Sequence, residues 1–131
     1  MAFVHLVLVL ALLEFFVFGM AVARARARYK VPAPATTGNE VFERYFRVQM
    51  NTLEQLTIFV PGLFLFAYYV NASIAAGLGA LFVVGRALYF QGYVKAPAAR
   101  HNGFMLSVIP NLVLLIGGGI GAIRALAMRG S

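Results

Sequence analysis

Long apolar runs, separated by short polar segments, make up most of the chain. Residues 1–23 carry one charged side chain, Glu14, and residues 55–85 and 101–123 carry none. About 20 apolar residues are enough for a helix to cross the ~30 Å hydrocarbon core of a bilayer. Each run therefore predicts at least one membrane-spanning helix.

The run over residues 55–85 is too long for one span, and Asn71 and Ser73 provide a turn in its middle. We place four helices at about 1–23, 38–69, 73–94 and 104–127, with the arginine block after residue 23 in a loop. The second helix is expected to begin with a capping box of Thr37 and Glu40 and to kink at Pro61. It is ~46 Å long, so its charged first half lies at or beyond one membrane face.

Composition supports a membrane protein. The chain is 62% hydrophobic and 11% charged, against about 45–50% and ~25% in soluble proteins. The sequence therefore predicts a single all-α domain over residues 1–131, an integral membrane four-helix bundle. The chain has no cysteine, and His5 and His101 have no partners at metal-ligand spacing, so we expect no disulfide and no metal.

Basic residues outnumber acidic ones by eleven to four, which gives a net charge of +7. Most of them cluster in the first and third loops, which four spans place on one side: Arg24, Arg26, Arg28, Lys30, Lys95 and Arg100. Cytoplasmic loops are enriched in Lys and Arg, so we expect this side in the cytoplasm, in a bacterial inner membrane or the endoplasmic reticulum. No exposed basic arm remains for nucleic acid.

Polar side chains form a stripe on the second helix, within an arc of ~80° at 100° per residue. The stripe consists of Arg44, Arg47, Asn51 and Glu54, with Gln55 beside it, and one face of the third helix carries Arg86, Tyr89 and Tyr93. Ionisable residues within spans mark functional sites. We therefore expect a polar cleft at the cytoplasmic end, with Arg100 near its mouth. Alternatively, these groups only satisfy one another, with Arg47 and Glu54 as an ion pair and the tyrosines as an interfacial belt.

Gln49 lies ~160° from Arg47 around the helix and cannot face the same cleft. It either meets another helix of its own chain or lines the cleft of a neighbouring subunit, which would require a symmetric oligomer. Gly117 and Gly121 form a GxxxG spacing that permits close helix contact, within the subunit or with a neighbour.

Several guanidinium groups and one carboxylate suit a small ligand with carboxylates and one ammonium group, because Arg binds carboxylates bidentately. An Arg can also hold a thiolate. Lowering a thiol pKa of ~8.5 by about two units takes ~2.7 kcal/mol of preferential anion binding. One Arg in a low-dielectric cleft can supply this.

The specific motifs are Arg26-Ala-Arg-Tyr-Lys-Val, Thr36-Thr-Gly, Phe42-Glu-Arg-Tyr-Phe-Arg-Val-Gln-Met-Asn51-Thr-Leu-Glu54 and Gly85-Arg-Ala-Leu-Tyr-Phe-Gln-Gly-Tyr93, followed by Arg100. Together they resemble the MAPEG superfamily (membrane-associated proteins in eicosanoid and glutathione metabolism), in its leukotriene C synthase and microsomal glutathione S-transferase branch. The matching segments lie between residues 26 and 103. The terminal helices match only in hydrophobicity.

The resemblance implies a homotrimer that binds glutathione, as co-substrate, between neighbouring subunits near the cytoplasmic face. By position, one subunit would contact glutathione through Arg47, Asn51, Glu54, Tyr89 and Tyr93, and the adjacent subunit through Arg26 and Gln49. Arg100 matches the catalytic arginine that holds the thiolate. Ala27 and Gln55 stand where leukotriene C synthase has an arginine and a tyrosine, which favours a broader transferase or peroxidase.

The implied function is detoxification by a membrane-bound glutathione transferase or peroxidase, with a lipophilic electrophile or hydroperoxide arriving from the membrane lipid. Two alternatives stay open: a small four-helix multidrug transporter that uses Glu14, or a non-catalytic family member that binds lipid. Glu14 itself can be a proton or cation site, a partner for an arginine such as Arg86, or neutral by protonation.

Overall fold

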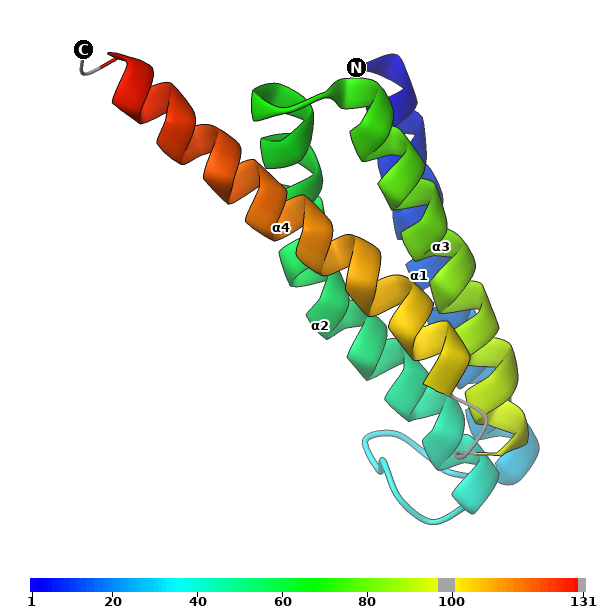
Figure 1. The fold of residues 1–131 in the computed structure, drawn as a ribbon. Helices are drawn as coiled ribbons and strands as arrows, with labels where there is room; N and C mark the ends of the chain where they lie inside the picture. The colour runs from blue at the N-terminus through cyan, green and yellow to red at the C-terminus, as the bar shows by residue number, and fades with distance from the viewer. Residues whose placement is uncertain (97–100, 130–131) are drawn as a thin grey trace.

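The computed structural model describes residues 1–96 and 101–129. Its helices are α1 (Ala2–Tyr29), α2 (Glu40–Tyr69), α3 (Ala72–Lys95) and α4 (His101–Arg129). They run alternately in opposite directions, so that α1 is parallel to α3 (Figure 1). All four are long and apolar enough to cross a membrane. The prediction of an all-α, four-helix membrane bundle is confirmed.

The helices α2 and α3 form the centre of the bundle. Both α1 and α4 pack against these two helices. The rings of Phe59 and Phe82 stack between α2 and α3 with their centroids 4.1 Å apart. In contrast, large apolar side chains such as Phe3 and Phe16 of α1 are exposed. A core inside an apolar exterior is the arrangement that a bilayer requires.

The first helix is longer than we expected from its apolar run. It continues through the arginine block to Tyr29, so that Arg24, Arg26 and Arg28 lie in its last two turns rather than in a loop. Ala and Arg are strong helix formers, and basic side chains interact favourably with a helix C-terminus. The helix ends at Lys30, which adopts the left-handed conformation.

The predicted capping box of α2 is wrong. The N-cap is Asn39, whose side chain accepts a hydrogen bond from the backbone N of Phe42 at 3.0 Å. Glu40 is the first helical residue, too early to reach back over the helix start, and Glu43 accepts from the backbone N of Gly38 instead, at 3.3 Å. Asn caps helices at least as well as Thr. Pro61 lies inside α2, which continues to Tyr69.

Glycines permit α4 to approach both central helices closely. A Cβ on Gly85 of α3 would lie 2.6 Å from the backbone N of Ser107 in α4. Further along α4, Cβ atoms on Gly117 and Gly121 would lie 2.6 and 2.7 Å from the side chains of Phe66 and Tyr69 in α2. The GxxxG segment therefore packs within the subunit.

Candidate functional site

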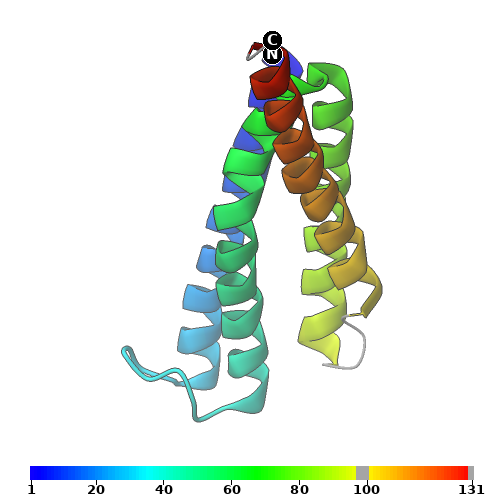
Figure 2. The same cartoon turned by 60° about the vertical axis from the view of Figure 1, so that its left-hand side comes forward.

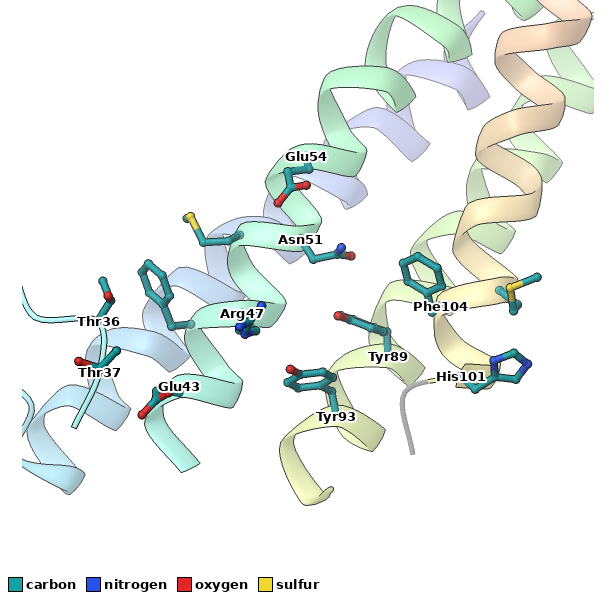
Figure 3. A pocket seen from close by; sticks show the side chains of 13 residues that line it. Thr36, Thr37, Glu43, Arg47, Asn51, Glu54, Tyr89, Tyr93, His101 and Phe104 are labelled. Carbon is teal, nitrogen blue, oxygen red and sulfur yellow. The ribbon is translucent and has the colours of Figure 1, made fainter. Parts of the chain in front are cut away.

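A cavity of about 860 Å³ opens at the end of the bundle where α1 ends and α4 begins. At this end the ribbon of α2 diverges from those of α3 and α4 (Figure 2). The lining residues are Thr36, Thr37, Glu43, Phe46, Arg47, Met50, Asn51, Glu54, Tyr89, Tyr93, His101, Phe104 and Met105 (Figure 3). The volume lies within the roughly 300–1,000 Å³ of typical small-molecule sites.

All five residues that were expected to act from one subunit line this cavity: Arg47, Asn51, Glu54, Tyr89 and Tyr93. The first three lie on successive turns of α2, and the two tyrosines lie on α3. The tyrosine hydroxyl groups point from α3 toward Arg47 and Asn51 (Figure 3). The structure thus joins the two polar faces that the helical periodicity indicated.

The charged groups of the cavity are not paired with each other. Arg47 and Glu54 are both exposed. Within residues 1–96 and 101–129, the ion pair that the structure contains joins Arg44 to Glu40, at 3.5 Å. The alternative in which Arg47 and Glu54 form a structural ion pair is therefore wrong. A guanidinium and a carboxylate instead face one cavity without neutralising each other.

The two tyrosines are buried rather than spread along a membrane interface. Tyr89 and Tyr93 are 5% and 7% exposed, and their ring centroids lie 5.5 Å apart. Both pack in one cluster with Phe18 of α1 and Val48 of α2. Three helices thus fix the tyrosines, and the alternative of an exposed interfacial belt is wrong for them.

Two residues of the predicted stripe serve packing instead. Arg44 donates hydrogen bonds to the carbonyl oxygens of Val94 and Lys95, at 3.3 and 2.9 Å, and so caps the C-terminus of α3. Gln55 accepts a hydrogen bond from Asn111 Nδ2 at 3.0 Å, which ties α2 to α4. Arg44 and Gln55 both lie near the predicted face of α2, but each forms hydrogen bonds to a neighbouring helix instead of lining the cavity.

Arg86 lies behind the cavity wall rather than in the cavity. Its side chain is fully buried. One guanidinium nitrogen donates to Asn51 Oδ1 at 2.8 Å and the other to Ser107 Oγ at 3.2 Å. The guanidinium also lies over the ring of Tyr89, 4.3 Å from its centroid. Arg86 therefore connects α2, α3 and α4 directly behind two residues that line the cavity.

The residues expected to act from an adjacent subunit do not line the cavity of their own chain. Arg26 donates to the carbonyl oxygen of Ala35 at 2.6 Å and lies 4.9 Å from the ring centroid of Phe42. Gln49 packs on α1, because a Cβ on Gly19 would lie 2.8 Å from its Nε2. Contact with its own chain is thus present, while a role in a neighbour's cleft stays a prediction. Arg100 lies outside the described residues.

Several lining residues were not anticipated. Thr36 and Thr37 reach the cavity from the segment before α2, and His101 reaches it from the first turn of α4. The Thr-Thr-Gly motif was a usable signal for the threonines. Phe104 and Met105 gave no signal, because apolar residues in an apolar helix look alike whether they face lipid or a cavity.

The sequence model of the MAPEG family matches residues 4–120. The uncharacterized protein sll1147 of Synechocystis is 55% identical over 84 residues, which cover 64% of this chain and 61% of the relative. Human microsomal glutathione S-transferase 2 is 44% identical over 85 residues, which cover 64% of this chain and 58% of the relative.

Bovine leukotriene C4 synthase is 34% identical over 67 residues, which cover 51% of this chain and 45% of the relative. The chain thus spans about half to three fifths of the length of these relatives. The family match, in contrast, extends over most of the chain, from residue 4 in α1 to residue 120 in α4. This protein is therefore an integral membrane protein that belongs to the MAPEG family.

Proposed function

We propose that this chain is a membrane-bound glutathione transferase that converts glutathione to its thiolate and adds it to a lipophilic electrophile. The observation that carries the proposal is the convergence of Arg47, Asn51, Glu54, Tyr89 and Tyr93 on one cavity. The names of two relatives, microsomal glutathione S-transferase 2 and leukotriene C4 synthase, support the same class of chemistry.

The chemistry of the cavity matches the groups of glutathione. Glutathione carries two carboxylates, one ammonium group and one thiol. Arg47 is a planar donor for a carboxylate, and Glu54 is an acceptor for the ammonium group. Asn51 and the two phenols supply shorter-range hydrogen bonds. Because Arg47 and Glu54 do not pair with each other, each keeps its charge available for the ligand.

Arg100 is the proposed catalytic residue, by its place in the motif. It would hold the sulfur as a thiolate, while the thiol proton leaves to solvent. The sulfur then forms a carbon–sulfur bond as the leaving group departs from the electrophile. With a lipid hydroperoxide, two glutathione molecules would instead give glutathione disulfide, an alcohol and water.

The complete site is proposed to lie between the subunits of a homotrimer. Arg26 and Gln49 would then reach the cavity of the adjacent subunit, which is consistent with their absence from the lining of their own. The cavity lies at the end that carries the arginine block, so the positive-inside rule favours a cytoplasmic active site. Phe46, Met50, Phe104 and Met105 form an apolar part of the lining that suits a substrate arriving from the bilayer.

The test is a stopped-flow absorbance measurement of thiolate formation when glutathione is added to the detergent-purified protein. We expect a thiolate signal at neutral pH, and thioether formation when a generic aryl halide follows. A protein that binds glutathione without any thiolate signal would act as a non-catalytic binder. A protein with no affinity for glutathione would remove the proposal altogether.

A further inference from the structure

Glu14 is a charged residue inside a membrane-spanning helix, and the proposed chemistry does not use it. The buried stripe of α1 consists of Val4, Val7, Ala11, Phe18, Val22 and Ala25. Glu14 follows Ala11 by three positions and precedes Phe18 by four, so it occupies the middle place of this stripe. It therefore faces the helices of its own bundle rather than lipid.

The packing of α1 on α3 places Glu14 level with Arg86. A Cβ on Gly79 would lie 2.5 Å from Val7, and the rings of Phe18 and Phe90 stack with their centroids 4.7 Å apart. Both contacts join residues that are 72 apart in the sequence, and Glu14 and Arg86 have the same separation. Since α1 and α3 are parallel (Figure 1), Glu14 lies opposite Arg86 between these two contacts.

Glu14 and Arg86 each have one buried polar atom that is left unsatisfied. Glu14 Oε1 and Arg86 Nε are buried and have no hydrogen-bond partner in the described part of the chain. No direct ion pair joins Glu14 and Arg86, but their opposite formal charges lie at the same level between α1 and α3. Opposite charges interact over several ångströms when low-dielectric surroundings screen them little.

We propose that Glu14 is a positioning residue, which provides the counter-charge for Arg86 and thereby holds Asn51 and Tyr89 in the cavity wall. Arg86 contacts both of these lining residues directly. Without Glu14, a buried guanidinium would lack compensation and would move toward the water of the cavity. This shift would displace Asn51 and Tyr89. Only the identity of the ligand, glutathione, rests on the proposed function.

The first test compares glutathione binding by detergent-purified wild type, Glu14→Gln and Glu14→Asp. We expect Glu14→Gln to raise the Kd about tenfold, as the loss of about one hydrogen bond to glutathione would, and Glu14→Asp to restore it to within about twofold. Leu13→Gln is the matched control, because Leu13 lies in the same turn and is 55% exposed. A Glu14→Gln Kd equal to that of wild type or of the control overturns the proposal.

The second test does not need glutathione. Thermal unfolding of Glu14→Gln, Arg86→Gln and the double variant forms a double-mutant cycle. Coupled charges predict that the double variant loses less than the sum of the single losses in Tm, and additive losses overturn the pairing. If wild-type protein fails to bind glutathione, the proposed function falls, and this cycle still decides whether Glu14 acts through Arg86.

Discussion

At the scale of single residues, the cavity depends on Arg47 and Glu54, two charges that form no ion pair with the residues that the structure describes. Arg44 and Arg47 are less than one helical turn apart, yet their side chains have different surroundings. Arg44 caps α3 and pairs with Glu40. Arg47 is exposed in the cavity opposite the tyrosines. The difference arises because α3 ends beside Arg44 and presents carbonyl groups to it.

The first prediction concerns Arg47→Ala. A charge-assisted hydrogen bond contributes about 1.5–3 kcal/mol, so we expect the glutathione Kd to rise roughly 10- to 100-fold. Equilibrium binding to the purified protein measures this. The matched control is Arg28→Ala, which removes a guanidinium that contacts Tyr29 near the end of α1. Equal loss in the two variants would mean that general charge attraction, rather than a specific contact, binds glutathione.

The second prediction separates binding from turnover. Arg100→Ala is expected to lower kcat strongly, by about 10²–10³-fold for one lost transition-state donor, while glutathione still binds. Arg47→Ala should show the reverse, a raised KM for glutathione with less effect on kcat. Steady-state kinetics with an aryl halide give both values. Full activity of Arg100→Ala would remove this residue from the mechanism.

At the scale of the helices, the position of α4 determines how the cavity wall is held. The backbone of α4 contacts α3 at Gly85, one residue before Arg86. Ser107 accepts the hydrogen bond of Arg86 at this contact. A shift of α4 would therefore reach the cavity through Arg86 and its contacts with Asn51 and Tyr89.

The third prediction tests this close approach with two glycines of α3. Gly85→Ala places a Cβ 2.6 Å from the backbone of Ser107, and such overpacking costs about 1–3 kcal/mol. A Cβ on Gly77 meets nothing within 4 Å, so Gly77→Ala keeps or gains stability through helix propensity. Thermal unfolding in detergent measures both. Equal Tm values for the two variants would show that the helices separate without cost.

At the scale of the whole molecule, the bundle has a packed middle and one open end. Its exterior is apolar along the spans, and the arginine block in the last turns of α1 lies at the same end as the cavity. In the proposed transferase, this arrangement would bring water-soluble glutathione and a lipid-dissolved electrophile to the same cavity. It also leaves Arg26 and Gln49 outside the cavity of their own chain, so that in the proposed homotrimer they would be available to the cavity of an adjacent subunit.

The fourth prediction follows from sites between subunits. Homotrimers of Arg26→Ala or of Arg47→Ala are each expected to bind glutathione weakly, and therefore to show little activity at a glutathione concentration well below their raised KM. When they are coexpressed in equal amounts and mix at random, about a quarter of the sites combine intact halves, as ring symmetry requires. Activity should return to about a quarter of the wild-type value. Mixed preparations as inactive as the separate variants would show that each subunit carries a complete site.

Much of this architecture follows from the sequence by itself. The apolar runs determined the number of helices and their approximate bounds, because membrane insertion depends on length and hydrophobicity. The positions of the Lys and Arg residues determined the basic end. Helical periodicity also identified Arg47, Asn51, Glu54, Tyr89 and Tyr93 as neighbours on two faces. The family motifs added which ligand these faces suit.

Only the tertiary structure decided which members of each face reach the cavity. Periodicity specifies the direction of a side chain but not which neighbouring helix lies opposite it. Arg44 therefore hydrogen-bonds to the C-terminal end of α3, and Gln55 hydrogen-bonds to Asn111. Arg86 is covered by α4 and hydrogen-bonds to Ser107. Glu14 lies at the same height in the bundle as Arg86 because of how far α1 is shifted along α3. This shift is set by the packing of side chains from both helices, so the sequence of one helix alone does not specify it.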